Sequence, residues 1–251
     1  MTARAAAERF EIDWSRPWLA PWRPRGEAIA VQAAQGGLLE ALNAASDPGV
    51  CVAAGRVRFV EPACQPPGEA YEAFVARTAC VPTRNNLHDF FSALVWLACP
   101  AWKRRLNELQ AGQIAHAGVA GTRGPVRDAL TLFDENAALL QAPPGLIDAL
   151  RARDWHTLFV TRREAWAQAR ITLFGHALLE KLTQPRKAIT AHVWLLPEGA
   201  DLASPLALQQ LTPERLADKP FLPLPVLGVP RWWPANEDAA FYADPAVFRR
   251  P

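Results

Sequence analysis

The sequence predicts an α+β fold: a single mainly helical domain with a β-hairpin, a few short strands, and extended Pro/Trp-rich termini packed on the body. Apolar residues recur at helical spacing in several long segments, whereas a few short segments alternate or are rich in β-branched residues. Of the 251 residues, 50% are apolar and 21% are charged. This composition suits one sizeable core and excludes an intrinsically disordered chain.

The individual elements follow from the hydrophobic spacing and from the prolines that bound each segment. In chain order we expect helices over 28–45, 69–78, the segment around His88, 101–116, 145–152, 154–172 and 174–183. Short strands are expected over 56–60 and 189–196. At 128–140 a strand-like run is followed by Asp-Glu-Asn, which has turn chemistry, so the β-hairpin is placed there.

We expect the chain to divide into three parts of one domain. Residues 1–25 form an extended arm, because three prolines oppose a regular helix, and its tryptophans pack on the body in preference to a partner. Residues 26–219 form the single α+β domain. Residues 220–251 form an ordered extended tail on the same domain, because this segment is too apolar for a flexible linker.

Composition also bears on the compartment. No apolar run reaches the roughly 18–20 residues that a membrane-spanning helix needs, and the first residues lack the pattern of a secretory signal. The four cysteines are irregularly spaced, which is typical of reduced thiols and speaks against a four-cysteine zinc site. We therefore expect a cytoplasmic protein without a membrane span.

The charge distribution gives no general case for a nucleic-acid partner. The net charge is only +2. Basic runs such as Lys103-Arg104-Arg105 fall in helical patterns and are expected on solvated faces. The expected partner is a small molecule or another substrate that the sequence does not name, and the oligomeric state is left open.

An imidazole and a carboxylate, His88 and Asp89, lie next to each other in one of the most apolar segments of the chain. Polar groups that are costly to bury are normally exposed to solvent, paired with a partner, or part of a functional site. Asn85, His88, Asp89 and Ser92 are spaced i, i+3, i+4 and i+7, so they share one stripe of a helix. The stripe is part of a site if it faces a cleft, and a solvated helix face otherwise.

Further histidines allow a metal site. His176 and Glu180 are four residues apart on a predicted helix, where both side chains can reach one metal ion or simply bond to each other. His192 lies in a strand-like run, where a core histidine is the simpler interpretation. Together with His88 these residues form a candidate site for one divalent metal ion, such as zinc or manganese.

Charged residues in two later segments complete the candidate catalytic set. The set comprises His88, Asp89, Arg127, Asp128, Asp134, Glu135 and Lys181. These residues form one site if the helices and strands that carry them converge. In such a site His88 or Asp89 acts as the base, and Arg127 or Lys181 stabilises a developing anion. The alternative interpretation of Arg127 beside Asp128 is a structural ion pair.

Five blocks of the sequence resemble an uncharacterised bacterial family, the one numbered 3025 among the domains of unknown function. The blocks are Asn86–Phe91 with Val95–Leu97, Arg127–Asn136, Phe174–Leu182, Thr190–His192 and Leu227–Glu237. The resemblance extends over nearly the whole chain. The family has no established activity, so the resemblance implies membership but no reaction.

Two main hypotheses of function remain. The leading one is a hydrolase-type enzyme with a site of His, Asp and Glu side chains, with or without one metal ion. The competing one is a non-catalytic binding or scaffold protein whose polar clusters are structural hydrogen-bond networks; a nucleic-acid-associated protein is the weakest option. The chain has no nucleophile elbow, phosphate loop, HExxH or dinucleotide fingerprint, and a His-Asp phosphohydrolase needs a histidine upstream of His88.

Overall fold

The N-terminal region consists of two helices that follow a short turn. The computed structural model describes residues 11–117, 124–202 and 204–249. A 3-10 turn, Pro17–Leu19, precedes the helices α2, Arg23–Gly36, and α3, Leu38–Ala45. Gly37 separates these helices with a φ of +100°, a conformation that glycine adopts without strain. The helix predicted over 28–45 is therefore present, but it is divided at its glycine pair.

Residues 11–22, before α2, do not form the extended arm that the prolines predict, and residues 1–10 of that arm lie outside the described residues. Pro17 begins the 3-10 turn, and Pro24 lies in the first turn of α2, where no helical hydrogen bond is lost. Trp14, Trp18 and Trp22 are at most 9% exposed and belong to the hydrophobic core. The expectation that these tryptophans pack within the chain is confirmed.

Two small sheets follow the N-terminal helices. Strands β1, Cys51–Val52, and β2, Gly55–Arg56, form a two-stranded antiparallel hairpin. Strand β3, Arg58–Val60, pairs in parallel with β4, Cys80–Pro82. Helix α4, Tyr71–Thr78, lies between β3 and β4 in the chain and ends at the left-handed Ala79.

Four helices form the centre of the molecule: α5, Leu87–Ala98; α6, Pro100–Ala117; α7, Pro125–Asn136; and the short α9, His176–Lys181. The Asn86 side chain caps α5 by accepting a hydrogen bond from the Asp89 N–H. Helix α5 contacts α6 and α9, whereas α7 contacts both α6 and α9. These contacts bring segments far apart in the sequence to one place.

The largest sheet has four strands in the order β6-β5-β7-β8. The strands are β5, Ala137–Gln141; β6, Arg170–Leu173; β7, Thr190–Leu195; and β8, Leu222–Pro225. Strand β5 is parallel to β7 and antiparallel to β6, and β8 is antiparallel to β7. Strand β5 is almost wholly buried, as its continuous apolar sequence requires.

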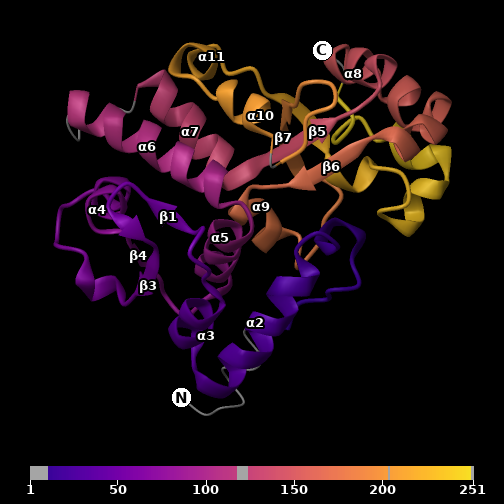
Figure 1. The fold of residues 1–251 in the computed structure, drawn as a ribbon. Helices are drawn as coiled ribbons and strands as arrows, with labels where there is room; N and C mark the ends of the chain where they lie inside the picture. The colour runs from indigo at the N-terminus through magenta and orange to yellow at the C-terminus, as the bar shows by residue number, and fades with distance from the viewer. Residues whose placement is uncertain (1–10, 118–123, 203, 250–251) are drawn as a thin grey trace.

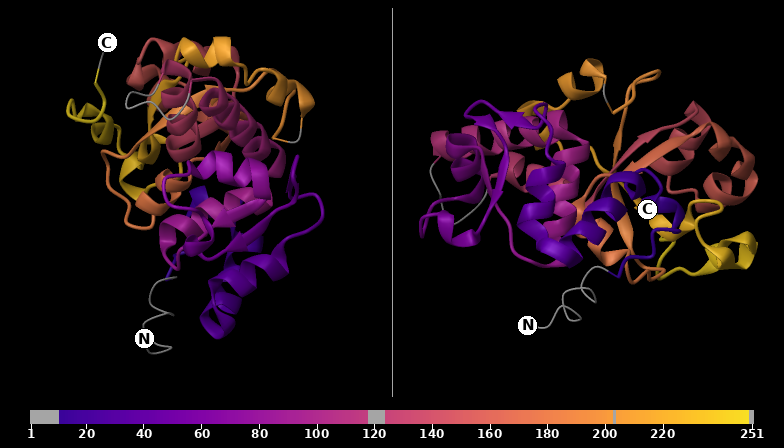
Figure 2. Two further views of the ribbon diagram at one scale, coloured as in Figure 1. Left: turned by 90° about the vertical axis from the view of Figure 1, so that its left-hand side faces the viewer. Right: turned by 60° about the horizontal axis from the view of Figure 1, so that its bottom comes forward.

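Short helical segments complete the fold. They are α8, Pro144–Arg151; a π turn, Thr157–Thr161; a 3-10 turn, Arg163–Gln168; α10, Pro205–Gln209; α11, Pro213–Ala217; and tail 3-10 turns at Val226–Gly228, Pro234–Glu237 and Ala239–Ala243. Figure 1 shows α2 and α3 at one end, the four-stranded sheet and α8 toward the other, and α5 and α9 between them. The left-hand view of Figure 2 shows the same separation.

The predicted α+β class is confirmed, but two elements were wrongly assigned. The hairpin is β1–β2, whereas residues 128–140 are mostly the end of α7 followed by β5. Ala129, Leu130 and Phe133 are buried together at helical spacing, and the expected turn residues end the helix instead. The helix expected over 154–172 is replaced by irregular turns and by β6, because pairing with β5 overrides the local helical pattern.

One hydrophobic core runs from the N-terminal tryptophans through α5 and the large sheet to Phe248 in the tail. The tail is ordered against this core, as its composition predicts. Within the described residues, no helix is long and apolar enough to cross a membrane.

Candidate functional site

A cavity of about 460 Å³ lies where α4, α5, α6, α7 and α9 meet β4. Helix α5 contributes His88, Asp89, Ser92 and Trp96 to its lining, at the spacing of one helical stripe. The predicted polar stripe therefore faces a cavity rather than open solvent. Asn85, the first residue of that stripe, is outside the lining.

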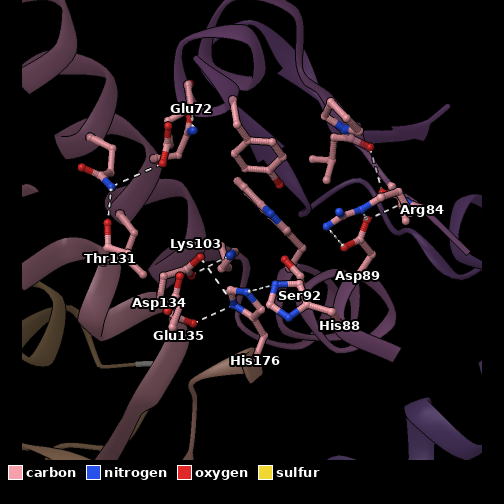
Figure 3. A pocket seen from close by; sticks show the side chains of 18 of the residues that line it. Glu72, Arg84, His88, Asp89, Ser92, Lys103, Thr131, Asp134, Glu135 and His176 are labelled. Carbon is pink, nitrogen blue, oxygen red and sulfur yellow. Dashed lines mark hydrogen bonds and ion pairs between the residues drawn. The ribbon is translucent and has the colours of Figure 1, made fainter. Parts of the chain in front are cut away.

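A polar contact between two histidines lies at the cavity. Nε2 of His88 lies 3.1 Å from Nε2 of His176, and the two rings are nearly perpendicular, at 81°. Nδ1 of His88 lies 2.8 Å from a carboxylate oxygen of Glu180, and Nδ1 of His176 lies 2.7 Å from the backbone carbonyl of Asp134. Figure 3 shows the two rings side by side, with Asp134 next to His176.

These partners fix where the protons of the two histidines lie. A carbonyl and a carboxylate only accept, so each Nδ1 carries a proton and donates it. Two neutral rings would then present bare lone pairs to each other across 3.1 Å. One extra proton between the Nε2 atoms removes this conflict, and the Glu180 carboxylate balances its charge at His88.

His176 is the neutral member of this pair. Burial lowers the pKa of His176 to about 4, although the Asp134 carboxylate acts in the opposite direction. The nearby Lys103 ammonium contributes to the decrease. Because neutral His176 donates its Nδ1 proton to the Asp134 carbonyl, its Nε2 is the acceptor that faces Nε2 of His88.

A buried lysine supports the Asp134 side of the site. Lys103 is only 3% exposed, and its Nζ lies 2.6 Å from Oδ1 of Asp134. Burial by itself raises the pKa of Asp134, but Lys103, His176 and His88 together outweigh it and leave that pKa below its usual value. The expectation that Lys103 lies on a solvated face is wrong, because α6 runs between α4 and α7.

At the other side of the cavity, Arg84 holds Asp89. The guanidinium makes two parallel hydrogen bonds to the carboxylate, at 2.9 and 3.0 Å, and the Arg84 backbone N–H adds a third at 2.6 Å. Asp89 is 8% exposed. Both of its oxygens accept hydrogen bonds from Arg84.

Sequence reasoning missed several lining residues, above all Arg84, Lys103 and Tyr71. A usable signal was present on the predicted helix 101–116. Lys103, Asn107 and Gln110 are spaced i, i+4 and i+7, and all three are buried in the cavity wall. Asn107 donates to the backbone carbonyl of Glu72. Nε2 of Gln110 lies 3.4 Å from Oε1 of Glu72 and 3.4 Å from Oγ1 of Thr131.

The structure brings together only part of the predicted catalytic set. His88, Asp89, Asp134, Glu135 and His176 line the cavity. The other predicted residues lie outside its lining: Arg127, Asp128, Lys181, Glu180 and His192. Glu180 still contacts the site through His88.

The residues outside the lining have other surroundings. Arg127 is buried on α7, and Asp128 is half exposed, 3.9 Å from Lys219. Lys181 donates to the Asn136 side chain at the surface. His192 lies in β7 with its ring 6.3 Å from Phe221, and burial lowers its pKa.

The predicted metal ligands do not assemble as a set. In the described part of the chain, no group of three or more His, Cys, Asp or Glu side chains is placed to hold a metal ion. Glu180 binds Nδ1 of His88, on the opposite side of the ring from the Nε2 that faces His176. His192 is not part of this arrangement.

Comparison with known proteins gives a family but no reaction. No curated protein and no solved structure matches the chain. Residues 57–251 match one family model. The matched residues include the cavity lining and the large sheet. The chain therefore belongs to the family described as Protein of unknown function (DUF3025).

Proposed function

We propose that the cavity is the active site of a hydrolase in which His88 and His176 share one proton. The observation that supports this proposal most is the 3.1 Å approach of the two Nε2 atoms, each ring being held by an oxygen acceptor at Nδ1. A structural network needs no such approach of two basic nitrogens at a cavity. The proposed chemistry uses only side chains and water, and it requires no metal ligand set.

A histidine pair with one shared proton contains an acid and a base at the same time, as two carboxylates do in other hydrolases. The hydrogen bond between the two Nε2 atoms opens when the substrate binds, and the freed lone pair of His176 Nε2 takes a proton from the attacking water. Nε2 of His88 gives its proton to the leaving group. The proton gained by His176 then crosses the 3.1 Å gap to His88, and the pair returns to its starting state.

One observation favours the non-catalytic alternative. Asp89 and Asp134, the most buried acids of the site, are each paired with a cation, Arg84 and Lys103. Such pairs hold helices in register without any reaction. In that case the cavity binds a ligand but does not transform it.

A substrate panel tests the proposal. The wild-type protein is assayed with chromogenic carboxylic esters, anilides and phosphate esters, beside His88→Gln, His176→Gln and the control His156→Gln. His156 is exposed and remote from the cavity lining. We expect hydrolysis of one class, a loss of about a hundredfold or more in the two cavity variants, and no change in the control.

Two results contradict the proposal. The first is that the folded wild-type protein hydrolyses none of the three classes. The second is that a hydrolysed substrate is turned over equally well by His176→Gln, with the thermal midpoint showing that this variant is folded.

A further inference from the structure

We infer that Tyr71 is a further catalytic residue, whose hydroxyl donates a hydrogen bond to the carbonyl oxygen of a neutral carboxylic ester or amide. This inference deepens the proposed function and rests on it. Tyr71 is the first residue of α4 and lines the same cavity as His88 and His176. Trp96, in the same cavity lining, is a close neighbour of its hydroxyl.

The Tyr71 hydroxyl stays protonated. Burial raises the pKa of Tyr71, and the nearby carboxylates of Asp134 and Glu72 raise it further. A phenol in this state does not act as a base. It can only donate its proton into a hydrogen bond, which is the property needed at an oxygen that gains negative charge.

Trp96 supplies a second, independent observation. Its side chain is 1% exposed, and its indole N–H has no hydrogen-bond partner in the described residues. A buried donor whose hydrogen bond is unmade destabilises the fold. The N–H is nevertheless near enough to Tyr71 to act on the hydroxyl, in the direction that lowers the pKa of Tyr71.

The two groups can therefore work in series. When Tyr71 donates its proton toward a substrate oxygen, negative charge builds on the phenolic oxygen. The Trp96 N–H then gains an acceptor and stabilises that charge. Tyr71 touches the substrate in this arrangement, whereas Trp96 is a positioning residue behind it.

The charge of the cavity selects among substrates. Its lining contains four carboxyl groups, Glu72, Asp89, Asp134 and Glu135, against Arg84, Lys103 and the one proton that the histidine pair shares. Arg84 and Lys103 are already bound to acids of the site. A phosphate or carboxylate substrate would meet repulsion that only the shared proton offsets, whereas a neutral carbonyl compound would meet none.

The hydrolysis balances with these groups. The water oxygen forms a bond to the carbonyl carbon as His176 Nε2 takes the water proton, and the carbonyl electrons move to the oxygen held by Tyr71. The bond from carbon to the leaving oxygen or nitrogen then breaks, and the leaving atom takes the proton of His88 Nε2. The products are a carboxylic acid and an alcohol or amine.

Kinetics of tyrosine variants test this role. The chain has two tyrosines, and the other, Tyr242, donates to the Gly228 carbonyl in the tail, which makes it a matched control. With a hydrolysed ester, Tyr71→Phe should lower kcat about a hundredfold with little change in KM. Trp96→Phe should lower kcat less, and Tyr242→Phe should leave it unchanged.

A spectroscopic probe separates this inference from the proposed hydrolysis. Acetophenone labelled with ¹³C at the carbonyl is bound to the protein, and its carbonyl stretch is recorded by difference infrared spectroscopy. We expect a shift to lower frequency in the wild type and in His176→Gln, and loss of the shift in Tyr71→Phe. If this pattern appears without hydrolysis of any ester, the proposed function fails while the role of Tyr71 as donor stands.

Three outcomes overturn the inference. In the first, the wild type does not bind the probe, or binds it without a shift of the carbonyl stretch. In the second, the shift of the carbonyl stretch persists in Tyr71→Phe. In the third, the wild type hydrolyses phosphate esters alone.

Discussion

Nε2 of His88 and Nε2 of His176 lie 3.1 Å apart, although the two residues are 88 positions apart in the chain. The approach depends on the packing of α5 against α9, and α9 in turn packs on α7. Glu180 and the Asp134 carbonyl hold the rings from behind.

Gly175 sets the distance between α9 and the end of α7. A Cβ at this position would lie 2.4 Å from the Glu135 carbonyl oxygen and 2.4 Å from the Asn136 nitrogen. Backbone atoms cannot move aside cheaply, so Gly175→Ala should lower the free energy of unfolding by about 1–3 kcal/mol or more. Urea denaturation measures the change.

Gly112→Ala is the matched control for Gly175→Ala. Gly112 lies in the middle of α6, and a Cβ there meets nothing within 4 Å. Alanine should stabilise this helix by up to about 1 kcal/mol. Equal effects of the two substitutions would mean that the close approach at Gly175 has no energetic importance.

The stability of the protein should depend on pH through His176. The pKa of His176 is about 4 in the folded protein and about 6.5 when unfolded, so the unfolded chain takes up this proton first as the pH falls. Stability is therefore lost from pH 6.5 down to pH 4, by about 3 kcal/mol for this group. His176→Gln should have a shallower decline over that window, measured by urea denaturation at several pH values.

His156→Gln provides the comparison for this pH series. His156 is exposed, so its substitution should leave the wild-type slope in place. A slope that is the same for wild type and His176→Gln would show that His176 titrates normally in the folded protein.

The Lys103–Asp134 pair should be costly to break from one side. Lys103→Met leaves the Asp134 carboxylate without its cation in the cavity wall, and such a loss costs about 3–5 kcal/mol for a fully buried pair. Because Asp134 is 27% exposed, we expect the lower end of this range. The double variant Lys103→Met with Asp134→Asn should recover part of the loss, since it removes the lone charge.

Arg104→Met is the control for Lys103→Met. Arg104 is the next residue of α6, and its side chain is 41% exposed. Its substitution should change the free energy of unfolding by less than about 1 kcal/mol. If Lys103→Met is as mild as this control, the buried ion pair does not stabilise the site.

Glu180→Gln separates stability from catalysis. The side chains of His88 and Glu180 are 37% and 38% exposed, so solvent screens their attraction and the loss of stability should be below about 1 kcal/mol. Catalysis should suffer more, because the shared proton loses its counter-charge. The prediction is a hydrolysis rate at least about tenfold lower, with a nearly unchanged thermal midpoint.

Glu108→Gln, on the exposed side of α6, is the matched carboxylate control and should leave both quantities unchanged. A fall of the thermal midpoint in Glu180→Gln as large as that of Lys103→Met would assign Glu180 a structural role instead.

Metal removal should have no effect on the proposed reaction. The protein purified in the presence of zinc and manganese should contain less than one ion per chain, and dialysis against a chelator should leave hydrolysis unchanged. Elemental analysis makes this measurement. If the wild type contains one tightly bound ion per chain that both His88→Gln and His176→Gln lack, the two histidines bind a metal ion and do not share a proton.

The sequence by itself determined the helix that carries the site. The spacing of His88, Asp89 and Ser92 within an apolar segment identified one face of α5, because helical periodicity is a local property that any reader of the sequence can measure. The family-like blocks around His176 and Asp134 indicated the other two segments of the site. The local sequence did not determine which residues these segments and the face of α5 contact.

The tertiary structure decided the pairing. Whether His176 meets His88 or a metal, and whether Lys103 faces water or Asp134, depends on how α5, α6, α7 and α9 pack. Local rules also failed for β6, which is a strand because β5 offers it hydrogen bonds across the sheet. Contacts between residues distant in the chain determine which side chains are buried. Burial lowers the pKa of His176 and so keeps this histidine neutral. The chemistry of the site could therefore be inferred only from the packed helices.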